Sequence, residues 1–354
     1  MKQKKIISLY FFVLTQLLLI NSLEIRNLTE INHKYYMNNI ENNTIPITMA
    51  LDDGYIYPTV VAITSVMENA NKNIVYEFYI MHSPKFCIEN KKKLKSLERK
   101  YKNCKINLID MTEDFKFKNA STSKIITTPS YYRLILPELL PNIHKIIYLD
   151  GDTLVLTDIK EMYNIDMENY YFKGFLDITV NGVDNFTLDN DHCICAGVML
   201  INLDELRKDN MVNKMYKFMK ENNDKLIQQD QTIINAVCYK KIGILPAKFG
   251  MFNFKNIKDL FHFTKNYRYK YKYSQSELKE AYIHPAIIHY VNKPWKRHKN
   301  YYKSNLWWEY ANKTDYYDEI CLEYPYEYSK IVKIIFFLFS ILLFFFVVLY
   351  LFFI

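Results

Sequence analysis

The sequence predicts an α/β protein built around a central, mainly parallel sheet, and three observations support this. Short apolar runs alternate with amphipathic segments of helical period through the middle of the chain. Two of these runs end in acidic residues, at Asp52 and Asp150. The chain has 354 residues, 50% of them hydrophobic, which suffices for one sizeable core. We therefore expect helices on both faces of a sheet whose strand ends carry the functional groups.

The first elements of this domain alternate regularly. Apolar runs at residues 45–51, 74–81 and 106–109 predict strands, and residues 59–69 predict a helix between the first two. Residues 91–105 alternate lysines with Leu94, Leu97 and Tyr101 at helical spacing. This pattern indicates a solvated amphipathic helix, so the net charge of +8 does not predict a nucleic-acid surface.

The second half continues the alternation less regularly. Residues 130–139 predict a helix closed by Pro141, which leads into a strand at 145–149. Further strands are expected at 172–176, 197–201 and 286–290, and helices at 203–220 and 229–237. Residues 253–282 carry little periodicity. Their basic and aromatic stretch 265–273 is read as a surface loop, with a ligand-binding groove as the alternative.

The two ends of the chain differ from the middle. Residues 1–22 are basic and then apolar, as in a signal peptide or signal anchor, and residues 23–44 read as a linker. Residues 301–330 are aromatic and acidic and are expected to form a juxtamembrane connector. Residues 331–354 are predicted to be a transmembrane helix, since a helix rising about 1.5 Å per residue would cross about 30 Å of hydrocarbon.

The expected location is the membrane, with the folded domain in the lumen of the endoplasmic reticulum or Golgi. The N-terminal signal and the sequons at Asn27, Asn42, Asn119, Asn185 and Asn312 favour the lumen. Lysines 330 and 333 oppose it, because basic residues flanking a membrane helix prefer the cytosol.

Six cysteines could form disulfides in such a compartment, but their spacing fixes no pairing. The Cys193-Ile194-Cys195 segment, which follows Asp191 and His192, is read as structural. A metal site is the alternative, but no second ligand pair stands at finger-like spacing.

The most informative segment is Asp150-Gly151-Asp152, which follows the apolar run at 145–149. Two carboxylates at the end of a strand suit a hard cation such as Mn²⁺ or Mg²⁺, which in turn would hold phosphate. Taken alone, the segment is equally well read as a strand-to-turn junction. The decision depends on whether other suitable groups converge on it.

Three other clusters offer those groups. His289 can complete the coordination of a cation held by the aspartates. Lys293 and Arg133 can neutralise a departing diphosphate. At the end of the first strand, Asp52 can accept from a nucleotide and Tyr55 can stack on its base. Each has a plain structural alternative: Asp52 could cap a helix, Tyr55 could be core, and His289 could be a buried, hydrogen-bonded histidine.

At this point residues 45–300 closely resemble the family 8 glycosyltransferases, retaining enzymes of the GT-A fold that use a UDP-sugar and Mn²⁺. No one motif is specific, but their order and spacing are. The segments that carry the resemblance are ITMALDDGY at 47–55, YYRL at 131–134, IYLDGD at 147–152, AGVMLIN at 196–202, DQ at 230–231, and the histidine and KPW of 289–295. The resemblance implies a GT-A, Rossmann-like nucleotide-diphospho-sugar transferase domain over residues 45–300.

The resemblance also implies roles for individual residues. The metal ligands would be Asp150, Asp152 and His289. The nucleotide and diphosphate site would be formed by Ala50, Asp52, Tyr55, Asp150, Gly151, Asp152 and Lys293. The donor-sugar site, with its catalytic groups, would be formed by Arg133, Asp230 and Gln231, with Gln231 near the anomeric carbon. Residues 253–282 would lie on the acceptor side.

The chain departs from the family pattern at several positions. Cys195 stands where many members have asparagine, Gly54 where an asparagine often contacts the base, and Thr232 where an acidic residue is common. The loop before Lys293 is shorter than in some members and lacks their glycine. These departures leave the donor preference open.

The expected function is transfer of a hexose, glucose or galactose, from a UDP-sugar to a glycan, glycoprotein or glycolipid, with no nucleic acid involved. Same-face attack is preferred to a covalent intermediate, because Gln231 is a weak nucleophile. Two alternatives stay open. One is a non-catalytic, membrane-tethered protein that binds UDP or sugar. The other, weaker one is a haloacid-dehalogenase-type phosphatase with Asp150 as nucleophile, although its other motifs are not found.

Overall fold

The computed structural model describes residues 43–111, 116–122, 127–177, 193–265, 273–296 and 301–325, together with 338, 339 and 341. The expected signal segment 1–22, nearly all of the linker 23–44 and most of the expected membrane segment 331–354 lie outside the described residues. In the part of the chain that is described, no helix is both long and apolar enough to cross a membrane.

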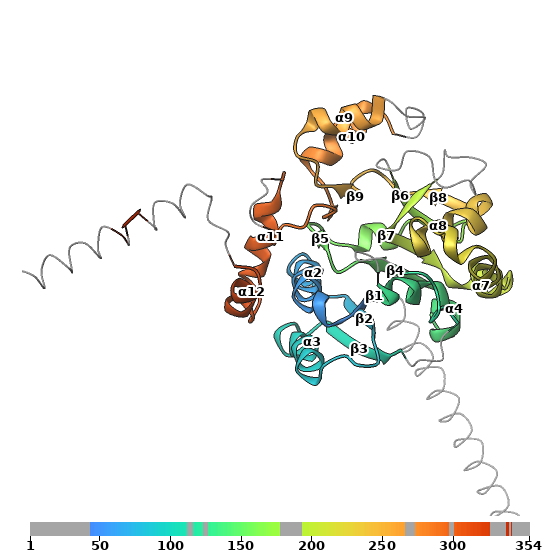
Figure 1. Cartoon of the computed structure of the whole chain (residues 1–354), viewed down its shortest axis with the longest axis horizontal. Coiled ribbons are helices and arrows are strands. Elements are labelled where there is room, and N and C mark those ends of the chain that lie inside the picture. Colours follow the sequence, from blue (N-terminus) through green and yellow to red (C-terminus); the bar gives the residue numbers. More distant parts are fainter. Residues whose placement is uncertain are drawn as a thin grey trace, which may run out of the picture.

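A seven-stranded sheet forms the centre of the molecule (Figure 1). Its strands in spatial order are β3 (Cys104–Asp110), β2 (Val75–His82), β1 (Thr44–Leu51), β4 (Lys145–Leu149), β7 (Ile194–Asn202), β6 (Phe172–Leu176) and β8 (Ile242–Ile244). The β3, β2, β1 and β4 strands run parallel, as do β6 and β8. The mainly parallel sheet is thus confirmed, with one addition: β7 is antiparallel to both β4 and β6.

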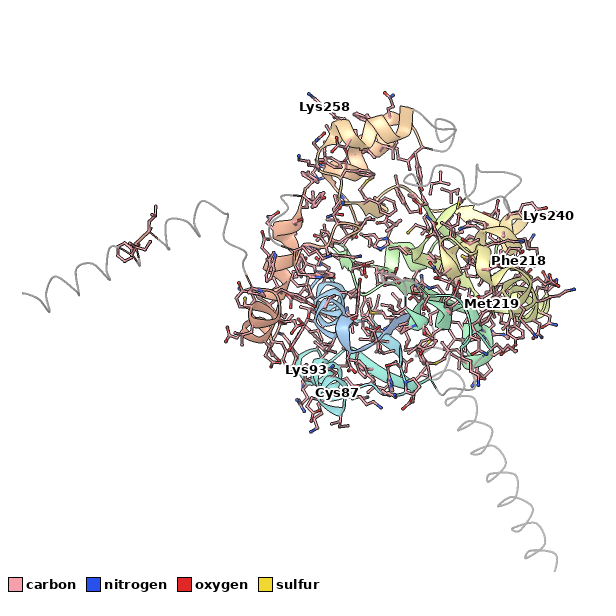
Figure 2. The ribbon with its side chains drawn as sticks, viewed as in Figure 1. Cys87, Lys93, Phe218, Met219, Lys240 and Lys258 are labelled. Carbon is pink, nitrogen blue, oxygen red and sulfur yellow. The ribbon has the colours of Figure 1, made fainter. Side chains whose placement is uncertain are left out.

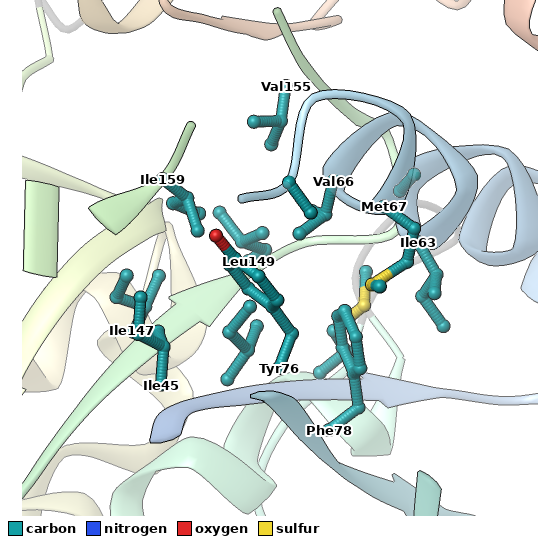
Figure 3. Packing of buried hydrophobic residues seen from close by; sticks show 14 of the residues in the cluster. Ile45, Ile63, Val66, Met67, Tyr76, Phe78, Ile147, Leu149, Val155 and Ile159 are labelled. Atoms are coloured by element: carbon teal, nitrogen blue, oxygen red, sulfur yellow. The ribbon is translucent and has the colours of Figure 1, made fainter. Parts of the chain in front are cut away.

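The central strands are buried on both faces, which explains their continuous apolar sequence. In β4, Ile147 and Leu149 face the core under α2 (Ile56–Glu68) and α3 (Ile88–Lys100). Ile146 and Tyr148 face the second core, on the opposite side of the sheet. Figure 3 shows the first core, where Leu149 lies beside Tyr76 of β2, and Phe78 of the same strand lies beside Met67 of α2.

The second core is covered by a group of shorter helices. They are the 3₁₀ helix η2 (Thr128–Ile135), α4 (Leu136–Leu139), α6 (Leu203–Lys208), α7 (Met211–Asn222) and α8 (Gln229–Cys238). The helix expected over 203–220 is therefore two helices, separated at Asn210, whose φ of 52° is left-handed. The helix expected over 130–139 is mostly 3₁₀, with Pro129 and Pro137 near the starts of its two parts.

A second, three-stranded sheet packs beside the first. It consists of β5 (Thr153–Val155), β10 (Ile287–His289) and β9 (Phe249–Phe252), with β10 in the middle. The chain enters it directly from β4, through Asp150, Gly151 and Asp152. Of its strands, only β10 is expected from the sequence. The three residues between β4 and β5 therefore join the two sheets.

The segment with little periodicity, 253–282, contains two helices, α9 (Ile257–Lys265) and α10 (Gln275–Ile283). They project together at one end of the molecule (Figure 1). Figure 2 shows Lys258 of α9 at this outer end, far from Lys93 of α3 at the opposite end. Most of the basic and aromatic stretch 265–273 lies outside the described residues.

Two helices occupy the expected connector 301–330. They are α11 (Ser304–Ala311) and α12 (Tyr317–Glu323), and they lie beside α2 (Figure 1). The Glu319 carboxylate pairs with Lys93 of α3 and accepts from the hydroxyl of Tyr57 at 2.9 Å. Trp307 is fully buried against α2 and β10 residues. The described part of this segment is thus folded onto the α/β domain.

Trp307→Ala tests whether this segment stabilises the domain. We expect the free energy of unfolding of the full-length chain to fall by about 3–5 kcal/mol, because the change removes a fully buried indole. The matched control is Leu322→Ala on α12, a side chain 81% exposed, which should change it by less than about 0.5 kcal/mol. Chemical denaturation of the wild type and both variants measures the difference. If Trp307→Ala is as stable as the wild type, the segment does not stabilise the domain.

Candidate functional site

The turn between the two sheets sets the positions of the predicted acidic residues. Asp150 and Asp152 follow β4, and Asp150 N donates to the carbonyl of Gly197 on β7 at 2.8 Å. Gly151 packs closely on α2, since a Cβ at this position would lie 2.6 Å from Thr59 Oγ1. Any larger residue would therefore push the turn away from the helix.

The pairing of β5 with β10 brings the histidine to the same place. His289 pairs with Thr153, the residue after Asp152, and Tyr290 N donates to the carbonyl of Asp152 at 2.9 Å. His289 Nε2 lies 3.1 Å from Asp152 Oδ1 and 3.8 Å from Asp150 Oδ2. The three residues expected to bind metal therefore converge, with one ligand atom of each within 4.8 Å of the others.

The geometry of this cluster fits a divalent cation. Asp152 Oδ1 is buried and accepts no hydrogen bond, even though His289 Nε2 is near, which is costly unless another positive group approaches it. Two carboxylates and an imidazole are oxygen and nitrogen donors of the kind that Mg²⁺ and Mn²⁺ accept. Within the described residues, Asp150, Asp152 and His289 could hold such an ion.

Two further cationic side chains balance the carboxylates. Lys293 pairs with Asp152 Oδ2 and donates to the carbonyl of Tyr290 at 3.1 Å. Burial alone would raise the pKa of Asp152, but Lys293 and His289 hold it well below its usual range. Burial likewise opposes the charge of Lys293, yet Asp152 raises the pKa of that ammonium. Both groups are therefore charged at neutral pH.

Arg133 joins the cluster from the other side. Its guanidinium lies 2.9 Å from Asp150 Oδ1 and 3.1 Å from Asp230 Oδ2, and it also donates to the carbonyl of Ala196. It stacks on the ring of Tyr148, 4.0 Å from the ring centre. This arginine is only 5% exposed, so its contacts hold Asp150 and Asp230 in fixed positions. Its expected contact with a donor sugar stays a prediction.

A cavity of about 380 Å³ opens over these groups. Its walls include Arg133, which was expected at the donor sugar, and all of the residues expected to bind nucleotide and metal, namely Ala50, Asp52, Tyr55, Asp150, Gly151, Asp152, His289 and Lys293. Asp52 accepts from Gly54 N at 3.2 Å and from Thr127 Oγ1 at 3.0 Å. It thus caps the short helix after β1, as the structural alternative expected, and also lines the cavity.

The loop that carries Lys293 is held by aromatic residues of the C-terminal helices. Trp308 Nε1 donates to the carbonyl of Pro294 at 3.1 Å. The Trp295 ring meets Tyr55 edge to face at 6.2 Å and packs against Trp307 at 5.2 Å. Tyr55 is thereby fixed with its ring against the cavity wall. Trp295 thus packs between the wall of the cavity and the C-terminal helices.

Asp230 and Gln231 are not among the residues that line the cavity. The Gln231 side chain accepts from Ala196 N at 2.9 Å and donates to Asp177 Oδ2 at 2.8 Å. Its place near a reacting carbon therefore stays a prediction. Asp177 was missed in the sequence, although an acidic residue directly after the apolar run at 172–176 was the available signal.

No disulfide joins any of the six cysteines. Cys195 lies on β7 with its sulfur 3.4 Å from His289 Nδ1, so it contacts one of the expected metal ligands. Cys193 and Cys195 do not converge on a metal site of their own among the described residues.

Comparison with known proteins identifies relatives of this arrangement. The sequence profile described as Glycosyl transferase family 8 matches residues 46–299. A putative glycosyltransferase of Haemophilus influenzae is 30% identical over 220 residues, which span 59% of this chain and 64% of that protein. The lipopolysaccharide 1,2-glucosyltransferase of Escherichia coli is 26% identical over 276 residues, covering 74% and 76% of the two chains.

A solved structure shows the same fold. The galactosyltransferase LgtC in complex with donor and acceptor sugar analogs is 22% identical, with a TM-score of 0.63, over 77% of this chain and 96% of that one. The predicted GT-A fold is thereby confirmed. None of these comparisons supports the phosphatase alternative.

Asp152→Asn tests the cation site. We expect affinity for Mn²⁺, used as the probe ion, to fall by more than about 100-fold, because even second-sphere changes in metal sites cost 10–100-fold. The matched control is Asp53→Asn, an exposed carboxylate after the neighbouring strand β1 that accepts from Cys87 N and Asn90; this variant should bind Mn²⁺ normally. Titrating free Mn²⁺ by electron paramagnetic resonance decides the matter; unchanged affinity in Asp152→Asn contradicts the assignment.

Proposed function

The chain belongs to glycosyl transferase family 8, and on that premise we propose that it transfers a hexose, glucose or galactose, from a UDP-sugar to a glycan, glycoprotein or glycolipid. Mn²⁺ or Mg²⁺ is the proposed metal, and the transfer is proposed to retain the configuration of the sugar. The observation that carries the proposal is the convergence of Asp150, Asp152, His289 and Lys293 at one cavity.

The residues of the cavity would divide the work on a UDP-sugar. Asp52 and Tyr55 would bind the uridine, and the Lys293 ammonium would contact the diphosphate and stabilise the negative charge of the departing UDP. Asp150, Asp152 and His289 would hold the cation, which, when bound, supplies further positive charge to the diphosphate. Arg133 would orient the sugar while it keeps Asp150 and Asp230 in place.

Same-face attack by the acceptor agrees with the environment of the expected nucleophile. Both ends of the Gln231 amide are hydrogen-bonded to protein groups, Ala196 N and Asp177, and an amide oxygen engaged in this way is an even poorer nucleophile. The proposed route therefore needs no covalent sugar–enzyme bond. The acceptor hydroxyl would attack from the side on which UDP departs.

The alternative is a protein that binds UDP or sugar without catalysis. It is favoured by the departures at Gly54, Cys195 and Thr232, whereas the intact set of charged groups around Asp152 favours an enzyme. UDP release from a panel of UDP-hexoses with Mn²⁺, in the presence and absence of glycan acceptors, separates the two. If the protein binds UDP but releases no UDP from any of the UDP-hexoses, the proposal that it is an enzyme is overturned.

We further propose that the protein is anchored in the membrane with its domain in the lumen of the endoplasmic reticulum or Golgi. The apolar ends of the sequence and its sequons support this proposal. A shift in mobility after glycosidase treatment of the expressed protein is the expected result. Unmodified sequons, together with cytosolic accessibility of the domain, would contradict it.

UDP release should depend on pH through Asp230. Burial raises the pKa of Asp230 to about 6, although Arg133 opposes the rise. If the ion pair with Arg133 is needed, activity falls about tenfold per pH unit below about pH 6, as the carboxylate takes up a proton. In Asp230→Asn we expect low activity with no inflection near pH 6. The surface variant Asp209→Asn should keep the wild-type profile.

This loss of activity at low pH is distinguishable from acid unfolding, because the contribution of Asp230 to stability changes with pH in the opposite direction. The unfolded pKa of an aspartate is about 3.9, below the folded value, so the stability contributed by Asp230 is present at low pH and is lost as pH rises from about 4 to about 6. This group therefore stabilises the fold in the range where activity declines. A wild-type pH profile in Asp230→Asn would refute its role.

A further inference from the structure

The imidazole of His289 is held in position from more than one side. It packs against β7, where a Cβ on Gly197 would lie 2.3 Å from His289 Cε1 and 2.7 Å from Asp150 Oδ2. Phe252 of β9 meets the imidazole at an interplanar angle of 65°, with the ring centres 5.6 Å apart. The ring can therefore neither slide along the strand nor tilt freely.

The two ring nitrogens then face different partners. Nε2 points to the carboxylates, 3.1 Å from Asp152 Oδ1 and 3.8 Å from Asp150 Oδ2. Nδ1 lies 3.4 Å from the sulfur of Cys195, which is two residues before Gly197 on the same face of β7 and only 7% exposed. The thiol is thus the partner of the nitrogen that is turned away from the carboxylates.

We propose that Cys195 is a positioning residue of the cation site, whose sulfur accepts the Nδ1–H of His289 and keeps the Nε2 lone pair directed between Asp150 and Asp152. The proposal rests on the proposed function, because it requires that His289 bind a metal. A histidine that binds metal through one nitrogen almost always donates from the other, which fixes its tautomer and ring orientation. The buried, unbonded Oδ1 of Asp152 marks the place toward which Nε2 is directed.

This role also accounts for one of the departures from the family pattern, the cysteine at position 195. The family pattern has an asparagine at this position in many members, and its loss raised the question of a missing sugar contact. The structure shows that the sulfur of Cys195 contacts the imidazole of His289. Sulfur is a weak hydrogen-bond acceptor, so its contribution is one of orientation and is measurable in the affinity for metal.

Cys195→Ala removes the acceptor and should weaken Mn²⁺ binding, measured in the presence of UDP, by roughly tenfold. Cys195→Ser restores an acceptor and should recover most of the affinity. The matched control is Cys238→Ala on α8, a buried cysteine in the second core, which should bind Mn²⁺ like the wild type. Melting temperatures of the variants show whether each is folded.

A spectroscopic measurement separates positioning from packing. Electron spin echo modulation of the bound Mn²⁺ should show coupling to an imidazole nitrogen in the wild type and in Cys195→Ser, and a weaker coupling in Cys195→Ala. Wild-type affinity and coupling in the alanine variant, or a serine variant no better than alanine, overturn the role of Cys195 alone. A wild-type protein that binds no Mn²⁺ overturns this inference and the proposed metal together.

Discussion

The close approach of two carboxylates, the buried Asp152 and the partly exposed Asp150, is the constraint on which the rest of the site depends. Two like charges this close, one of them buried, are tolerated only when cationic or other polar partners surround them. The partners are Arg133, His289 and Lys293, which come from three different parts of the chain. The fold must therefore bring η2, the end of β10 and the following loop to the one turn where β4 becomes β5.

The small second sheet brings His289 to the two carboxylates. Because β5 follows the acidic turn without a gap, the pairing of Thr153 with His289 fixes the distance between imidazole and carboxylate. A shift of one residue in this register would turn His289 to the opposite face of the sheet. A sheet with three strands thus controls the geometry of the cation site more directly than the larger sheet does.

Much of the large sheet could be predicted, because β1, β2, β3 and β4 are apolar runs bounded by turns. The strands β5, β8 and β9 could not, since three or four residues contain too little periodicity to be distinguished from a loop. The antiparallel direction of β7 was equally hidden, because a strand buried on both faces has the same apolar sequence in either direction. In α11 and α12, aromatic residues obscured the helical pattern, and their contacts in the structure, including the burial of Trp307 and the pairing of Glu319 with Lys93, show that they belong to the domain.

For the site, the sequence could predict which residues take part but not all of their contacts. The three residues that the family resemblance proposed as metal ligands lie together in the structure, but the resemblance could not show which other side chains are already hydrogen-bonded to protein groups. Gln231 with Asp177, and Cys195 with His289, depend on the register of β6, β7 and β10, which no local pattern encodes.

The residues that support the site extend beyond residues 46–299, which match the family profile. Lys293 lies on a short loop whose Pro294 carbonyl is bonded to Trp308, and whose Trp295 is packed between Tyr55 and Trp307. The position of the ammonium beside Asp152 is thus set by a helix that begins after residue 300. Because an ion pair in a buried site is favourable only when its geometry is maintained, the aromatic contacts of α11 contribute to the charge balance at the acidic turn. The segment expected to act as a passive connector to the membrane therefore supports the wall of the proposed nucleotide site from behind Lys293 and Tyr55.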